Sequence, residues 1–136
     1  CPDRPLPPQP GDALADALRS PEILPIATAL LDEVARDRAA WLPPWDDPRP
    51  SLAHGILDDE TYDALAILRA MLISGGSPIV VSEDTVAEAE TLGSSATGID
   101  VDATGTSGLA GLLTWSRALP APPNERIALL FTGARR

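Results

Sequence analysis

The stretch Pro78-Ile79-Val80-Val81-Ser82-Glu83-Asp84 changes from an apolar run to a polar, acidic one. Its apolar half, residues 78–81, is typical of a short strand that is covered on both faces of a sheet. Ser82 is a preferred N-cap residue, and the two acids after it favour the positive end of a helix dipole. The stretch therefore predicts a strand that leads directly into a helix.

The chain beyond this stretch repeats the alternation of strand and helix. Ile99–Val101 predicts a second short strand, and Gly105–Arg117 predicts a helix with its leucines facing inward. Arg126–Phe131 predicts a last strand, which ends at Thr132-Gly133. Two crossovers of this kind imply a parallel sheet with helices on its faces. We therefore expect an α/β fold with parallel strands and covering helices.

The chain before this stretch has helical periodicity. Apolar residues within Ile26–Trp41 form one stripe, which predicts an amphipathic helix. A second helix is expected from Asp58 or Asp59 to about Ile73. It is apolar nearly all round, so we expect it to be buried. The glycines after Ser74 are expected to end it with a left-handed cap.

Prolines divide the chain. They are concentrated between Pro2 and Pro50, and those of residues 1–11 predict an extended or irregular opening because each fixes φ and removes a backbone donor. We expect residues 1–50 to be a proline-rich segment with a helix, partly irregular. Residues 51–136 are expected to form the C-terminal α/β part.

Composition excludes several classes of protein. The formal net charge of −10 and the pI of about 4.3 argue against nucleic acid or an anionic membrane as the main partner. No apolar run approaches the ~20 residues of a membrane span. The single cysteine, Cys1, cannot form an internal disulfide, so a cytoplasmic location is expected. With one histidine and one thiol, a conventional zinc site is excluded.

The basic residues give a sharper exclusion, because every one of them is arginine. Schiff-base chemistry, Walker-type phosphate loops and Ser/Lys dyads all require a lysine amine. The 136 residues therefore cannot carry out any of these by themselves.

Ligands of open parallel sheets bind beyond the carboxyl ends of the strands. On the predicted fold this rule selects Ser82, the segment 102–107 and Thr132-Gly133. A hydroxyl followed by glycine suits a ligand that approaches the backbone closely, but a strand ending in a turn is the more common reason for such a pair. Gly105, Gly108 and Gly111 recur every three residues, which indicates close helix packing more often than a flat ligand.

Two other groups have simple structural interpretations. His54 could titrate near neutrality, but a lone histidine beside a glycine is more often a turn or cap residue. Asp58-Asp59-Glu60 could suggest a metal, yet three acids at a helix start are better explained by capping and the helix dipole.

Four segments taken together resemble the C-terminal part of a fold-type II pyridoxal-phosphate enzyme, with threonine synthase the most similar and threonine dehydratase and the tryptophan synthase β subunit more distant. The segments are SLAHGI (51–56), GGSPIVVSED (75–84), TGIDVDATGTSGLAG (97–111) and LLFTG (129–133). Their order and spacing carry the resemblance, which covers Ser51–Arg136 well and the residues before it loosely.

The resemblance implies a set of residues that bind pyridoxal 5′-phosphate. Thr132-Gly133 matches the family's hydroxyl-glycine pair, whose hydroxyl bonds the pyridine nitrogen. Ser51 to Gly55 resembles the small-residue segment beside the cofactor. The family's acid-then-small motif resembles Asp102-Ala103-Thr104-Gly105, although relatives usually carry Glu where this chain has Asp102.

The family's Schiff-base lysine and glycine-rich phosphate loop have no counterpart in this sequence. We therefore expect the C-terminal portion of a threonine-synthase-like lyase, which forms one wall of the cofactor site and is inactive without the missing N-terminal part. The resemblance implies an amino acid as its substrate. A homodimer is one oligomeric state that the complete enzyme could adopt. The alternative is a non-catalytic acidic α/β module that binds a partner or small ligand.

Overall fold

The computed structural model describes residues 17, 20–44, 50–58, 60–74, 76–118 and 126–134. The expected irregular opening at residues 1–11 lies outside them. The chain divides into two compact units. One contains the described residues of Arg49–Leu57 and Ile79–Arg136, and is called the α5–α6 unit. The other contains those of Pro7–Pro48 and Asp58–Pro78, and is called the α2–α4 unit.

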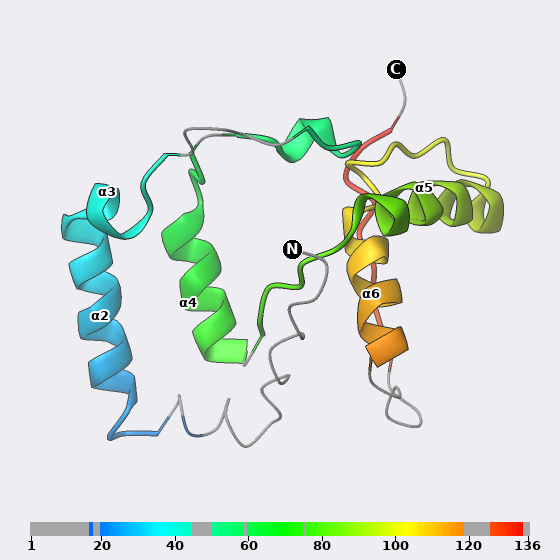
Figure 1. Ribbon diagram of the computed structural model, residues 1–136. Helices are drawn as coiled ribbons and strands as arrows, with labels where there is room; N and C mark the ends of the chain where they lie inside the picture. Colours follow the sequence, from blue (N-terminus) through cyan, green and yellow to red (C-terminus); the bar gives the residue numbers. More distant parts are fainter. Residues whose placement is uncertain are drawn as a thin grey trace. The chain divides into compact units, whose positions relative to one another are not determined.

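The α2–α4 unit begins with two helices where the sequence predicted one. Helix α2 spans Leu24–Arg36 and α3 spans Arg38–Trp41 (Figure 1). Asp37 separates them with φ −135° and ψ 62°, and its carboxylate accepts a hydrogen bond from the Ala40 amide at 3.3 Å. An aspartate side chain that competes for backbone donors favours a cap over a helix interior. The prediction missed this break because apolar spacing alone continues through it.

Helix α4 spans Ala64–Ser74, and it begins later than the sequence predicted. Asp58 accepts from the Glu60 amide at 3.2 Å, so it closes a local turn and does not cap the helix. Asp59, the other expected cap, lies outside the described residues. The expectation of a buried helix is also wrong, because Ala64 is its only buried residue in the described part. Helix α4 packs against α2, and one neighbouring helix covers one face only. Its end at Ser74 agrees with the prediction, while Gly75 lies outside the described residues.

The α5–α6 unit contains a short 3₁₀ helix, His54–Ile56, and two longer helices, α5 (Glu83–Thr97) and α6 (Ser107–Ala118). Ser82 caps α5 as predicted, since its hydroxyl accepts from the Thr85 amide at 3.3 Å. The helix ends at Gly98, whose φ of 72° is the left-handed conformation that glycine adopts without strain.

Helices α5 and α6 pack against each other (Figure 1). Ala89 and Ala110 are fully buried and belong, with Val86 and Leu109, to the core cluster of this unit. At the surface, one Nη atom of Arg117 donates to both carboxylate oxygens of Glu88, at 2.6 and 2.7 Å. The hydrogen bond and the charge of Glu88 raise the pKa of Arg117. This ion pair joins the two helices where both side chains face water.

The predicted α/β fold is wrong: the described residues contain helices and no β-strand. Of the three predicted strands, 78–81, 99–101 and 126–131, none is paired with another. In the described part the only strand-type pairing is a single antiparallel bridge between Val101 and Ala134. The Val101 amide instead donates to the carbonyl of Ile99 at 2.9 Å, which bends that segment.

The side chains of these segments also lack the covering that a parallel sheet requires. Val80 is 83% exposed and Leu130 is 79% exposed. A short apolar run indicates a tendency toward burial, but a strand exists only where a second backbone supplies its hydrogen bonds. The three apolar segments are present in the sequence, but in the described part of the chain none of them forms backbone hydrogen bonds with another.

Candidate functional site

Three segments that the sequence analysis selected separately meet in the α5–α6 unit. They are the loop 51–55, the turn 102–106 that leads into α6, and the pair Thr132-Gly133. The first contact joins the loop to the turn, because the Gly55 amide donates to Oγ1 of Thr104 at 3.0 Å. A Cβ on Gly55 would lie 2.9 Å from the same oxygen, so glycine is needed for this approach.

The turn is held by Asp102. One carboxylate oxygen of Asp102 accepts from the Gly105 amide at 2.7 Å, and its carbonyl accepts from the Thr106 amide at 3.0 Å. Thr106 is fully buried, and its hydroxyl donates to the same carbonyl at 3.0 Å. These bonds use backbone donors that a helix start would otherwise leave unpaired. Asp102 therefore fixes the turn that carries Thr104 and Gly105.

The second contact brings the backbone at Gly133 against the same turn. The Thr132 amide donates to the Gly105 carbonyl at 3.4 Å. A Cβ on Gly105 would lie within 3 Å of the Gly133 backbone, and one on Gly133 would overlap the Asp102 carboxylate. By contrast, a Cβ on Gly111 would meet nothing within 4 Å. Of the glycines spaced by three, Gly105 alone needs the absence of a side chain.

Thr132 lies at this junction, where its amide bonds to Gly105. Thr132 is exposed, and its side chain makes no hydrogen bond with another described residue. The backbone here is held by the Thr132 amide and by the bridge of Ala134 to Val101. The hydroxyl is a neutral, exposed group that can donate or accept a hydrogen bond toward a ligand.

Ser51 reaches the cluster through Glu83, which the sequence analysis assigned only to the dipole of its own helix. Oε2 of Glu83 accepts from the Leu52 amide at 2.8 Å. The Leu52 bond, followed by one from the Ser51 hydroxyl, lowers the pKa of Glu83 below its usual 4.5. Ser51 Oγ also accepts from the Ala53 amide at 3.1 Å. An acid in a first helical turn normally serves that helix, so no sequence signal indicated this link.

His54 lies in the 3₁₀ helix and is exposed, with Nδ1 3.2 Å from the Leu52 carbonyl. This contact agrees with a turn residue. Among the described residues, no group of three or more histidine, cysteine, aspartate and glutamate side chains is arranged to hold a metal ion.

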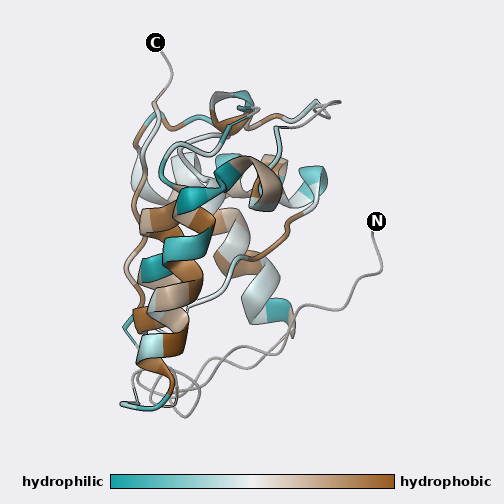
Figure 2. Cartoon of the chain, turned by 90° about the vertical axis from the view of Figure 1, so that its left-hand side faces the viewer, coloured by the Kyte–Doolittle hydropathy of each residue, from teal (hydrophilic) through white to brown (hydrophobic). Residues whose placement is uncertain are grey.

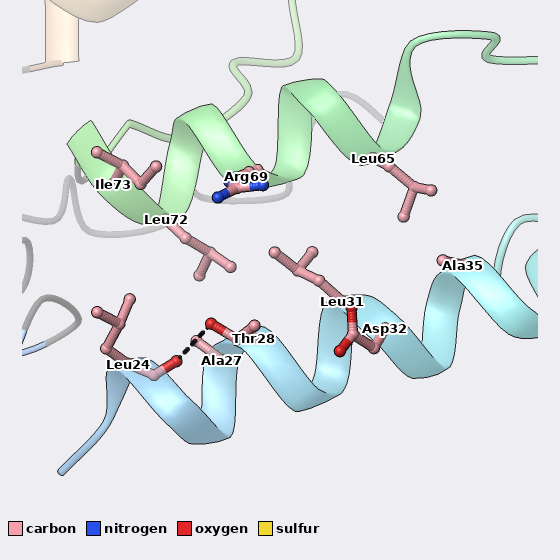
Figure 3. Close-up of a pocket in the computed structure, with 10 residues that line it drawn as sticks. All are labelled: Leu24, Ala27, Thr28, Leu31, Asp32, Ala35, Leu65, Arg69, Leu72 and Ile73. Carbon is pink, nitrogen blue, oxygen red and sulfur yellow. Dashed lines mark hydrogen bonds between the residues drawn. The ribbon is translucent and has the colours of Figure 1, made fainter. Parts of the chain in front are cut away.

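The α2–α4 unit contains a separate pocket between its two longer helices (Figure 3). Its volume is about 240 Å³. Leu31 of α2 and Leu72 of α4 point into the space between the helices, and the charged side chains Asp32 and Arg69 belong to its lining. The sequence analysis did not identify this pocket, because apolar spacing does not show how closely two helices meet.

We compared the chain with protein-family models, curated proteins and solved structures, and none matches it. The resemblance to pyridoxal-phosphate enzymes therefore rests on the residues themselves. In the part of the chain that the structure describes, no helix has both the length and the apolar character needed to cross a membrane.

Proposed function

We propose that the α5–α6 unit forms one wall of a pyridoxal 5′-phosphate site in a threonine-synthase-like lyase. The observation that carries the proposal is the junction of Gly55, Thr104, Gly105 and Gly133 beside the unbonded Thr132 hydroxyl. The junction forms without a β-sheet in the described residues. The lysine and the phosphate loop would come from polypeptide outside this sequence, which contains no lysine.

The residues of the junction fit one side of the cofactor. The Thr132 hydroxyl would donate a hydrogen bond to the pyridine nitrogen, and a neutral donor of this kind does not enforce ring protonation. Gly105 and Gly133 let two backbone segments meet next to Thr132, because neither carries a side chain. When bound, pyridoxal phosphate supplies an electron sink for elimination and replacement at the β and γ carbons of an amino acid.

The remaining residues hold this wall in place. Asp102 would keep the turn closed through its bond to the Gly105 amide. Thr104 and Glu83 would hold opposite ends of the loop 51–55 through the amides of Gly55 and Leu52. In the proposed site these groups position the wall, and the proton transfers would fall to the lysine from outside this sequence.

The test is binding of N-(5′-phosphopyridoxyl)-L-threonine, a reduced adduct that needs no lysine to bind. Amide NMR of the 136-residue protein should show saturable shifts at Gly105, Thr132 and Gly133. Thr132→Val should weaken the binding by roughly two- to tenfold, the net value of one hydrogen bond. Thr132→Ser should retain it.

Thr91→Val is the matched control, because Thr91 is exposed on α5 and its hydroxyl is bonded to the Ala87 carbonyl within the same helix. Its adduct binding should equal that of the unchanged protein. Equal binding by Thr132→Val, or shifts confined to other parts of the chain, would contradict the proposal. Failure to bind the adduct at all would favour the non-catalytic alternative.

A further inference from the structure

The pocket between α2 and α4 is called the α2–α4 groove below, and its shape follows from the size of the side chains that line it. On α2 the lining side chains follow helical spacing, and three of them, Ala27, Thr28 and Ala35, are small. Small residues at a helix contact leave space that the leucines of both helices do not fill. Leu24 and Ile73 lie at the same end of the groove and remain 46% and 48% exposed. The groove thus offers apolar surface that a ligand would remove from water.

Hydrophobic residues occur along the whole of α2, and hydrophilic residues lie between them (Figure 2). Two of the residues that line the groove are charged, Asp32 on α2 and Arg69 on α4. Neither forms an ion pair or hydrogen bond with another described residue. The hydroxyl of Thr28 already donates to the Leu24 carbonyl at 2.8 Å. Asp32 and Arg69 are both exposed, and they are the charged lining groups that can meet a polar ligand atom from solvent.

The two opposite charges restrict the ligand class. A simple carboxylate would be attracted by Arg69 but repelled by Asp32 and by the net charge of −10. A simple amine would be attracted by Asp32 and by the net negative charge but repelled by Arg69 next to the groove. A zwitterion carries one group for each side chain and no net charge. The apolar lining adds the requirement of a hydrophobic substituent.

The volume sets the size of that substituent. A protein cavity of about 150 Å³ holds benzene. The groove, at about 240 Å³, holds a somewhat larger molecule. Leucine, isoleucine, methionine and phenylalanine have this size, whereas glycine and alanine would leave most of the apolar lining in water.

We propose that the α2–α4 groove binds a free α-amino acid with an aliphatic or aromatic side chain. Arg69 receives the α-carboxylate, Asp32 receives the α-ammonium group, and the side chain lies among the leucines. Charge complementarity with a zwitterion is the reason for this occupant over a second copy of the chain. All residues of this site belong to the α2–α4 unit, and none belongs to the proposed cofactor wall.

The experiment is titration of the 136-residue protein with L-leucine, followed by amide NMR. Saturable shifts are expected at residues of α2 and α4 that line the groove. Two ligands dissect the charges: 4-methylpentanoate lacks the ammonium group, and isoamylamine lacks the carboxylate. Each should bind about tenfold more weakly than leucine, as expected for loss of one hydrogen bond to a charged group.

Two variants assign the charges to their residues. Arg69→Gln should remove the preference for leucine over isoamylamine, and Asp32→Asn should remove the preference over 4-methylpentanoate. Arg36→Gln is the matched control, because Arg36 is exposed on α2 and does not line the groove. Thr132→Val should leave leucine binding unchanged, which separates this site from the cofactor wall.

A third variant tests the apolar part. Ala35 is exposed and lines the groove, so Ala35→Leu should fill the groove and lower leucine affinity while the helix is retained. The proposal is overturned if leucine and 4-methylpentanoate bind equally, or if Arg69→Gln binds leucine as the unchanged protein does. Concentration-dependent shifts at the groove without ligand would instead identify a second copy as the occupant, and would also overturn it.

Discussion

Glu83 belongs to helix α5 by sequence, yet its carboxylate holds the backbone of a loop 31 residues earlier in the chain. Since this hydrogen bond lowers the pKa of Glu83, folding favours the ionised form. Its contribution to stability is therefore complete above the unfolded value of 4.5 and is lost as the pH falls through the lower folded value.

We predict that Glu83→Gln lowers the denaturant midpoint at pH 7 and that the difference from the unchanged protein shrinks in the acid range below 4.5. The amide of glutamine retains an acceptor but not the charge, so the loss at pH 7 should be partial. Denaturant unfolding at several pH values measures both effects.

Asp84→Asn is the control for this prediction, because Asp84 also lies in the first turn of α5 and interacts with the same helix dipole. If the two variants have the same pH dependence, the helix dipole explains the effect and the link to Leu52 contributes nothing measurable.

At the scale of elements, local signals predicted the helices better than they predicted the strands. The Ser82 cap and the α6 helix follow from residues close together in sequence, and both are present, although α6 begins at Ser107 and not Gly105. The strand at 126–131 depended on neighbours that no local signal can supply. Likewise, the apolar composition of α4 could not reveal how many helices would cover it.

The candidate site was predicted in part, for a related reason. Gly55, Thr104 and Gly133 were selected in three separate segments, and the structure brings them together. That contact does not depend on the sheet that was expected to create it. Glu83 was missed because the partner of a surface carboxylate is a tertiary feature. The pocket in the other unit was missed because it depends on how two helix faces meet.

Replacement by alanine should change stability in opposite directions at Gly105, which precedes α6, and at Gly111, which lies within it. Gly105→Ala places a Cβ within 3 Å of the Gly133 backbone, so we predict a loss of about 1–3 kcal/mol of stability. Gly111→Ala has open space around its Cβ and lies inside α6, so a gain of up to about 1 kcal/mol is expected. Thermal or denaturant unfolding of both variants measures the difference, and equal effects would contradict the close approach at Gly105.

At the scale of the whole molecule, exposed apolar side chains and net negative charge act against each other. Val80, Ile127 and Leu130 are among the large hydrophobic residues that remain exposed. At pH 7 the charge of −10 keeps molecules apart, but near the pI of about 4.3 this repulsion disappears. Association through apolar surface should then dominate.

We predict that light scattering by the protein has its maximum near pH 4.3, and that a hydrophobic dye already binds at pH 7. Added salt should increase scattering at pH 7, because about 0.1 M salt screens charges beyond roughly 10 Å. The double variant Val80→Thr, Leu130→Thr preserves every charge, so it should lower scattering and dye binding without moving the pH of the maximum. A variant that scatters as strongly as the unchanged protein would show that these two segments do not drive association, and a maximum far from pH 4.3 would show that net charge does not restrain it.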